Sequence, residues 1–204
     1  MICAMTDPIA HAADRLIEAP AAENQWTISP QPTPQSVLET ARLILHSVSY
    51  CSLSTCSLAG EPWVSPLFFA FDDELSFYWS SAIASQHSQN LYNNGGKGAI
   101  ALYPSKGEIG AGQGLYFKGT ATELEQSGVE KAIACINRRT GQRAGKSVQR
   151  HPEDYLGDSV RRMYRFVPQQ AWCTGDRLLH NGVLVDTKVE TTVAELAAAL
   201  AQRN

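Results

Sequence analysis

The chain has 204 residues, of which 44% are hydrophobic, 8% aromatic and 18% charged. This composition is typical of a folded globular protein, and it excludes a disordered chain, a collagen and a coiled coil. At about 100–200 residues per domain, the length fits one domain with extensions. The 17 Lys and Arg against 20 Asp and Glu give a net charge of −3, so the chain lacks the basic excess of a nucleic-acid-binding protein.

Cysteine usage and the start of the chain indicate a cytoplasmic protein. The 5 cysteines include no Cys-x-x-Cys pair, which argues against a disulfide framework and a structural zinc site and for a reducing compartment. The first residues include Asp7 and Asp14 without a continuous apolar core, unlike a secretory signal. No run of ~18 apolar residues occurs, so we expect no membrane span. Because no metal-binding spacing and no basic excess occur, we also expect no metal and no nucleic-acid partner.

Residues 1–35 are expected to form a proline-rich N-terminal extension. They contain 5 of the 10 prolines, and proline removes a backbone donor and fixes φ. A partly ordered tail and a short helix at 9–18 both fit this segment. The first helix is predicted to begin at Ser36, because Ser36 followed by Glu39 has the form of a capping box.

Three strands joined by tight turns are predicted next. The residues are hydroxylic, aromatic or β-branched, which favours strands, and turn signals occur at 59–62 and 72–74. The pattern predicts an antiparallel meander of strands at 49–58, 63–71 and 75–80.

The rest of the chain mixes further strands with short helices. Helices are predicted at 85–92, 125–139 and 193–202, and strands at 99–103, 115–124 and 159–173. Strands do not alternate regularly with long helices, so a doubly wound parallel sheet is disfavoured. The fold class is therefore mainly β (α+β), an antiparallel barrel with short accessory helices. We expect the barrel domain at 36–175 and a C-terminal tail and helix at 176–204.

Two glycine-rich segments fail the requirements of a phosphate-binding loop. Residues 107–114 are not preceded by a parallel strand and followed by a helix, and 141–147 has three residues between its glycines where the P-loop has four. The basic stretch at 138–150 is either a solvated loop or a loop that binds phosphate or a partner. It carries Arg138, Arg139, Arg143, Lys146 and Arg150.

The segment 85–90 (SQHSQN) begins a predicted helix directly after a strand. Free N–H groups and the positive end of a helix dipole attract phosphate, and Ser85, His87 and Ser88 add donors. A capped surface helix explains the same residues. No Gly-x-Ser-x-Gly elbow occurs, and Cys51 and Cys56 should face opposite sides of their strand. An enzyme built on this chain would need an organic cofactor.

Four blocks in this order and spacing resemble the pyridoxamine 5′-phosphate oxidase-like superfamily of FMN-binding split β-barrels. They are 60–73 (GEPWVSPLFFAFDD), 75–81 (LSFYWSS), 85–91 (SQHSQNL) and 114–121 (GLYFKGTA). The resemblance runs from about residue 38 to 124, with a looser match at 159–173. It implies an FMN-dependent oxidoreductase that forms a homodimer and holds FMN between its subunits.

The resemblance also assigns candidate cofactor-binding residues. It places Val64, Ser65, Pro66 and Leu67 along the isoalloxazine ring, and Trp79, Ser80 and Ser81 near the ring and the ribityl chain. It places Ser85, Gln86 and His87 at the phosphate. Gln113 or Gly114 would approach from the neighbouring region, and Trp172 is a candidate neighbour of the ring.

The chain departs from the oxidases at the positions that recognise the phosphate and the substrate. The oxidases carry an arginine on the second strand and a basic pair at the helix start, where this chain has Ser65 and Gln86-His87. Lys118 or the basic stretch would have to compensate. A late Arg-x-His pair is replaced by Arg177-Leu178-Leu179-His180, which argues against pyridoxamine phosphate oxidation. The alternatives are a relative that binds a deazaflavin or haem, with His180 as the haem candidate, and a non-catalytic flavin-binding dimer.

Overall fold

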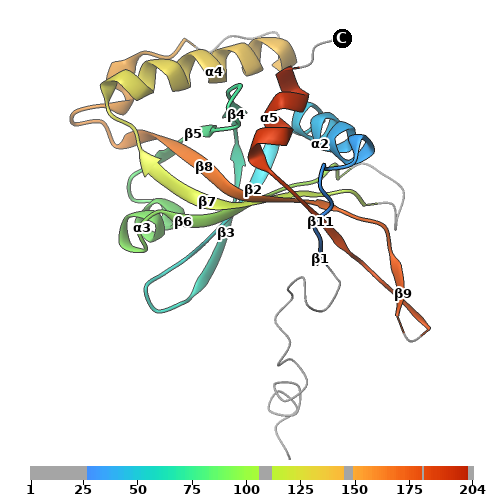
Figure 1. The fold of residues 1–204 in the computed structure, drawn as a ribbon. Coiled ribbons are helices and arrows are strands. Elements are labelled where there is room, and N and C mark those ends of the chain that lie inside the picture. Colours follow the sequence, from blue (N-terminus) through green and yellow to red (C-terminus); the bar gives the residue numbers. More distant parts are fainter. Residues whose placement is uncertain (1–26, 106–111, 145–148, 181, 202–204) are drawn as a thin grey trace, which may run out of the picture.

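The computed structural model describes residues 27–105, 112–144, 149–180 and 182–201. The alternative helix at 9–18 and most of the connection at 104–114 therefore lie outside the described residues. One strongly curled sheet, antiparallel except where β1 pairs with β11, dominates the fold (Figure 1). Its strands are β1 (Thr27–Ile28), β2 (Tyr50–Cys56), β3 (Pro62–Phe68), β4 (Ala70–Phe71), β5 (Phe77–Ala82), β6 (Lys97–Leu102), β7 (Leu115–Glu123), β8 (Arg161–Thr174) and β11 (Lys188–Thr191).

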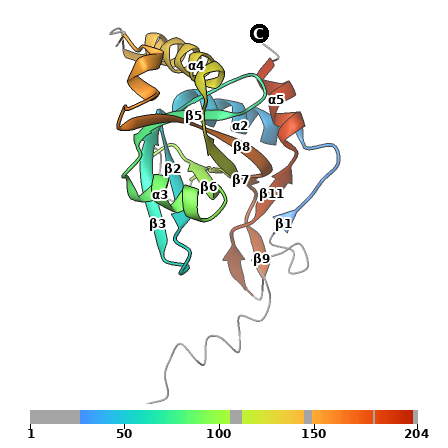
Figure 2. The same ribbon diagram turned by 90° about the vertical axis from the view of Figure 1, so that its left-hand side faces the viewer.

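Four helices and a separate hairpin accompany the sheet. The helices are α2 (Gln35–Ser47), α3 (Gln86–Asn93), α4 (Gln126–Ala144) and α5 (Val193–Ala201), with a 3₁₀ turn at Pro152–Tyr155. Strands β9 (Leu178–His180) and β10 (Val183–Val185) form a two-stranded hairpin that extends from the body (Figure 2). The structure confirms the predicted fold class of an antiparallel split barrel with accessory helices.

The sheet order is β1-β11-β8-β7-β6-β2-β3, and β5 joins it through β8. The predicted meander is confirmed at both of its turns, since β2 pairs with β3 and β4 pairs with β5, in each case in antiparallel fashion. The predicted strand at 63–71 is divided into β3 and β4, and the other edge of β5 pairs with β8. Phe69 and Ala70 lie at the division and are both fully buried, Phe69 in the main core and Ala70 in a second core cluster beside α4.

The predicted capping box at Ser36 is wrong. Helix α2 begins at Gln35, with Pro34 at the N-cap and no side-chain cap. The carbonyl of Pro34 accepts the N–H groups of Val37 and Leu38. Proline lacks an N–H and has a fixed φ, so it is well suited to the start of a helix. Helix α2 therefore begins at Gln35, one residue before the predicted start at Ser36.

A capping box occurs instead at the start of α5, where none was predicted from the sequence. The Thr192 Oγ1 accepts the Glu195 N–H at 3.1 Å, and the Glu195 carboxylate accepts the hydroxyl of Thr192 at 2.7 Å. The same carboxylate accepts the backbone N–H of Thr33 at 2.9 Å, so α5 holds the segment that leads into α2. Leu196 of α5 belongs to the main core, and β11 pairs with β8.

The core lies inside the curl of the sheet. Alternate residues of β7 form its inward face, since Leu115, Phe117, Gly119 and Ala121 are all buried. Gly119 sits at an irregularity in the pairing with β8, and a Cβ there would lie 2.2 Å from the carbonyl oxygen of Val167. Only glycine permits so close an approach of two backbones.

Arg139 joins three elements from within the protein. It is 6% exposed, and its guanidinium donates to the carbonyls of Leu45 and Val48 at the end of α2. The same group lies over the rings of Phe69 and Phe71, with 4.3 and 4.9 Å to the centroids. The interpretation of residue 139 as part of a solvated loop is therefore wrong, because α4 continues to Ala144 and turns this side chain inward.

We expect Arg139→Ala to lower the free energy of unfolding by about 2–4 kcal/mol, because buried carbonyls lose their donor and two aromatic rings lose their cation. Urea unfolding monitored by circular dichroism measures the change. The matched control is the exposed neighbour in Arg138→Ala, which should stay within about 0.5 kcal/mol of wild type. Equal effects of the two substitutions would contradict this role.

Candidate functional site

The start of helix α3 meets strands β3 and β5 at a cluster of polar side chains centred on His87. The His87 ring is buried, with 7% of the residue exposed. Its Nδ1 lies 3.1 Å from the Ser65 Oγ on β3. Its Nε2 lies 2.7 Å from the Ser81 Oγ on β5 and 3.1 Å from the Ser85 Oγ. The structure thus brings together four residues that the resemblance assigned to a cofactor site.

Local structure explains why these side chains converge. Ser65 faces inward from β3 and Ser81 inward from β5. Ser85 is the N-cap residue of α3, yet its side chain makes no capping bond. Its hydroxyl instead donates to the Ala82 carbonyl at 2.9 Å and lies 2.9 Å from the Ser88 Oγ. The first N–H groups of α3 therefore have no side-chain cap, which leaves backbone donors available at the helix start.

The hydrogen bonds around His87 fit a neutral ring that carries its proton on Nε2. Trp63 Nε1 donates to the Ser65 Oγ at 3.0 Å, which leaves the Ser65 hydroxyl proton free to donate to His87 Nδ1. The ring then carries its own proton on Nε2 and donates to Ser81 and Ser85. Burial lowers the pKa of His87, so the imidazole is neutral at pH 7.

Strand β3 exposes apolar side chains on both of its faces. Strand β3 forms one edge of the main sheet (Figure 1). Val64 is 61% exposed and Trp63 49%, Pro66 is exposed, and Leu67 is half-buried. This strip lies on the strand that also carries Ser65, so an apolar surface adjoins the polar cluster.

Trp79 and Ser80 are placed differently from Ser81. The Trp79 side chain is in the core, 1% exposed, and stacks on Tyr164 with 5.7 Å between centroids and 14° between planes. Its side chain therefore does not form part of the surface beside β3. Ser80 accepts a hydrogen bond from the Arg161 guanidinium at its Oγ (3.1 Å). Because successive strand residues face opposite sides, Ser80 and Arg161 lie on the other face of β5 from Ser81.

Gln113 and Trp172 form a second group, away from His87. Gln113 is exposed just before β7, and Trp172 on β8 pairs with Tyr116 of β7. Ser81 pairs with Arg162 near the other end of β8. Arg162 and Trp172 are ten residues apart along β8, which corresponds to ~33 Å measured along the strand. Within one chain the candidate residues therefore form two separate groups.

Gln86 lies on the exposed side of α3. Its side-chain amide donates to Asn90 Oδ1 at 2.8 Å, and Asn90 donates to the Thr55 hydroxyl of β2 at 3.0 Å. Lys118 is exposed on β7, and Arg150 donates to Asn137 Oδ1 at 2.9 Å.

Cys51 and Cys56 face opposite sides of their strand, as predicted. Cys51 is buried and Cys56 exposed on the same strand, β2. Burial raises the pKa of the Cys51 thiol to about 12, so this thiol is protonated and poorly nucleophilic.

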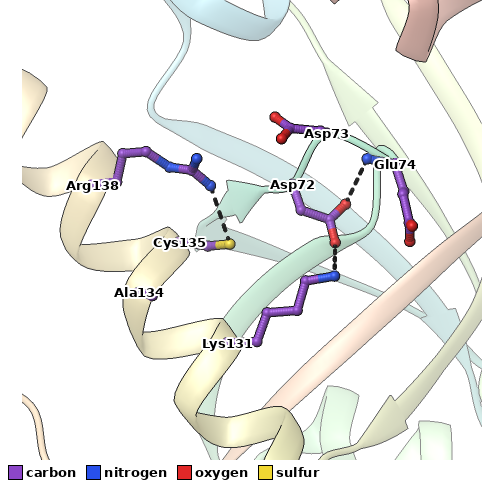
Figure 3. Close-up of a pocket in the computed structure, with 7 residues that line it drawn as sticks. All are labelled: Asp72, Asp73, Glu74, Lys131, Ala134, Cys135 and Arg138. Carbon is purple, nitrogen blue, oxygen red and sulfur yellow. Dashed lines mark hydrogen bonds and ion pairs between the residues drawn. The ribbon is translucent and has the colours of Figure 1, made fainter. Parts of the chain in front are cut away.

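A pocket of about 440 Å³ lies elsewhere, between α4 and the turn that joins β4 and β5 (Figure 3). Asp72 accepts the Lys131 ammonium at 2.6 Å, the Ser76 N–H at 2.9 Å and the Tyr78 hydroxyl at 2.9 Å. Burial acts to raise the pKa of Asp72, but these donors outweigh it and hold the pKa below its usual range. The carboxylate is thus fully engaged in anchoring α4 to this turn.

Trp63 and Ser88 also belong to the cluster, through their hydrogen bonds to Ser65 and Ser85, although Trp63 is not among the residues predicted from the sequence. Trp63 was adjacent to the assigned segment, and its spacing of two from Ser65 places both on one side of a strand. In the described part of the chain, no group of His, Cys, Asp and Glu side chains is arranged to hold a metal ion. The helices within those same residues are too short or too polar to cross a bilayer.

The buried neutral state of His87 predicts a pH dependence of stability. The unfolded chain binds a proton at histidine near pH 6.5, whereas the folded chain resists it. The free energy of unfolding should therefore fall as pH drops from 7.5 to 5.5. His87→Gln should flatten part of this slope, as measured by urea unfolding at several pH values. A slope identical to wild type would show that His87 does not titrate differently in the folded state.

Comparison with known proteins supports the assignment of the fold. The family model described as pyridoxamine 5′-phosphate oxidase matches residues 37–172. No curated protein is significantly similar to the chain. A heme binding protein from Mycobacterium smegmatis aligns with a TM-score of 0.58 and 19% identity, covering 81% of this chain and 62% of that one. ChuZ from Campylobacter jejuni aligns with a TM-score of 0.57 and 14% identity, covering 75% and 63%.

HutZ, the heme storage protein from Vibrio cholerae, aligns with a TM-score of 0.50 and 20% identity, covering 67% of this chain and 90% of that one. At these identities the likeness concerns the fold. The chain spans about 62% of the length of the Mycobacterium smegmatis protein. The family match, which covers most of the curled sheet and the start of α3, shows that the chain belongs to the pyridoxamine 5′-phosphate oxidase family.

Proposed function

We propose that the protein binds FMN and acts as a flavin-dependent oxidoreductase whose cofactor lies between the subunits of a homodimer. The observation that carries the proposal is the convergence of Ser65, Ser81, Ser85 and His87 at the start of α3, beside an exposed apolar edge strand. Membership of the family supplies the cofactor class.

The donor set at the start of α3 suits a phosphate monoester. Ser85 is half-buried and its hydroxyl is within reach of solvent, and the first N–H groups of α3 have no side-chain cap. Backbone N–H groups at a helix start and hydroxyl donors are established phosphate ligands. The first N–H groups of α3 would hold the phosphate, and the Ser85 hydroxyl would turn from the Ala82 carbonyl to donate to it. Ser65, Ser81 and His87 would fix the position of Ser85 and the helix start.

The exposed apolar strip on β3 suits the flat ring of a flavin. Val64 offers exposed apolar surface, and the strand backbone offers polar groups at its edge. Trp172 lies ten residues along β8 from Arg162, the strand partner of Ser81, and Gln113 precedes β7. A two-fold axis would bring the second group of one copy beside the first group of the other. This complementarity is the reason for proposing a dimer.

When bound, the flavin supplies the hydride and electron transfer, for which the protein provides binding and orientation. The residues of this chain bind the phosphate, support one face of the ring and exclude water from the buried His87 cluster. No residue in the cluster is assigned as a catalytic acid or base.

Haem is the alternative ligand, and the three similar solved structures named above motivate it. The start of α3 lacks the cations that the oxidases use for FMN phosphate, so a ligand without a phosphate deserves a direct test. The haem candidate, His180, lies on β9 opposite Val183.

We expect purified protein to bind FMN with quenching of flavin fluorescence and to bind riboflavin more weakly. Ser85→Ala should weaken FMN binding about 10-fold or more, because a hydrogen bond to a charged group is lost. The same substitution should leave riboflavin binding unchanged, because riboflavin has no phosphate. Ser54→Ala, an exposed serine on β2, is the control and should bind both ligands as wild type does.

Spectra of the purified protein distinguish the alternatives. A Soret band with no response to FMN would replace the flavin proposal with a haem one, and a band unchanged in His180→Ala would then exclude His180 as a ligand. FMN binding without turnover with any reduced nicotinamide donor would indicate a non-catalytic flavin-binding dimer. Mass spectrometry of the co-purifying molecule identifies a deazaflavin.

The β9–β10 hairpin is expected to contribute to the dimer. Its side chains include Leu179 at 73% and Leu184 at 61% exposure, and contiguous exposed apolar residues mark association surfaces. Leu179→Asp should shift the protein toward monomer in sedimentation velocity and weaken FMN binding in parallel. Leu43→Asp, an exposed leucine on α2, should leave both unchanged. A monomeric wild-type protein that binds FMN would contradict the shared site.

A further inference from the structure

The polypeptide around the proposed phosphate site is almost free of charge. From Leu75 to Gly96 the chain contains no Asp, Glu, Lys or Arg, and β3 contains none either. His87 is the one side chain in these segments that titrates near neutral pH. A phosphate with two negative charges would therefore meet hydroxyls, N–H groups and His87, but no permanent cation from the elements that form the cluster.

The ionisable groups on the neighbouring elements are directed elsewhere. Arg161 of β8 bonds to Ser80 on the other face of β5, and Arg162 forms an ion pair with Glu123 at 2.8 Å. Helix α3 packs mainly against β2, β3 and β7, and it also contacts β5 at Ser81 and β8 at Tyr164. Besides His87 and Glu123, the ionisable side chains of β2, β3, β5, β7 and α3 are Tyr50, Cys51, Cys56, Tyr78, Tyr92, Tyr116 and Lys118. The side-chain hydrogen bonds of His87 all involve serines.

We propose that His87 takes up a proton when the phosphate group of the ligand binds at the start of α3, and so supplies the positive charge that the site otherwise lacks. This inference rests on the proposed function and concerns how the same site balances charge. It assigns to His87 the part that arginine or lysine plays in the related oxidases, with the difference that the charge is present only in the complex.

The hydrogen bonds around His87 accommodate the second proton without moving heavy atoms. The Ser65 oxygen has two lone pairs, so it accepts Trp63 Nε1–H and His87 Nδ1–H together once its own hydroxyl proton rotates away. Ser81 and Ser85 continue to accept from Nε2–H. Each ring N–H in the charged state therefore has an oxygen acceptor at 3.1 Å or less.

Thermodynamic linkage gives the direction of the effect. Burial disfavours the charged ring in the free protein, and an adjacent anion favours it. Binding of a phosphate raises the pKa of His87, and the affinity for FMN rises as the pH falls toward the phosphate's own second pKa near 6. One linked proton produces at most about a tenfold change in affinity per pH unit.

Isothermal titration calorimetry with FMN at pH 7, in two buffers with different ionisation enthalpies, counts the protons taken up. We expect wild type to take up a substantial part of one proton with FMN and none with riboflavin, which has no phosphate. His87→Gln should take up none, and its affinity for FMN should lack the rise from pH 8 to pH 6.5 that wild type shows. FMN binding by wild type without proton uptake, or equal uptake by His87→Gln, overturns the inference.

A second measurement covers the case in which His87→Gln does not fold. The ring C–H resonances of wild-type His87, titrated with and without FMN, should move their midpoint to higher pH in the complex. An unchanged midpoint with FMN bound overturns the inference and leaves the proposed function intact. Absence of FMN binding at every pH overturns the proposed function, and the inference with it.

Discussion

The whole sheet depends on one long strand. Strand β8 has 14 residues and forms ladders with β5, β7 and β11. Because β8 curls, its two ends face different surroundings, with Arg162 beside β5 and Trp172 beside β7 and β11 (Figures 1 and 2). The close approach of Gly119 to the Val167 carbonyl permits the irregular pairing in the middle of the strand. The separation of the two groups of candidate site residues follows directly from this geometry.

Buried polar side chains join the elements around the sheet. Arg139 ties α4 to the end of α2 and to the rings beside β4. Asp72 ties the β4–β5 turn to α4 through Lys131. His87 ties α3 to β3 and β5. Each buried group has hydrogen-bond partners, as a low-dielectric interior requires, and each connects segments that are far apart in sequence or that pack at an angle.

The His87 cluster has a neutral chemistry that its position in the family does not suggest. Where related oxidases carry cations, this chain has a ring held neutral by burial and surrounded by hydroxyls. Such a cluster is stable without a ligand, because no charge is left uncompensated in the interior. In the proposed complex His87 becomes charged only when an anion binds, so occupancy of the site depends on pH.

Much of this protein was determined by its sequence alone. Hydrophobic periodicity placed β2, β7, α3 and α5 within a few residues, because alternation and helical spacing act locally. The resemblance in four spaced blocks predicted the family and the segment containing His87. Only the tertiary structure decided which side chains meet. It buried Arg139 from a stretch that looks solvated, placed Trp79 in the core, and joined Ser65 to His87 across 22 residues. Those outcomes depend on strand pairing and helix packing between distant segments, which no local pattern specifies.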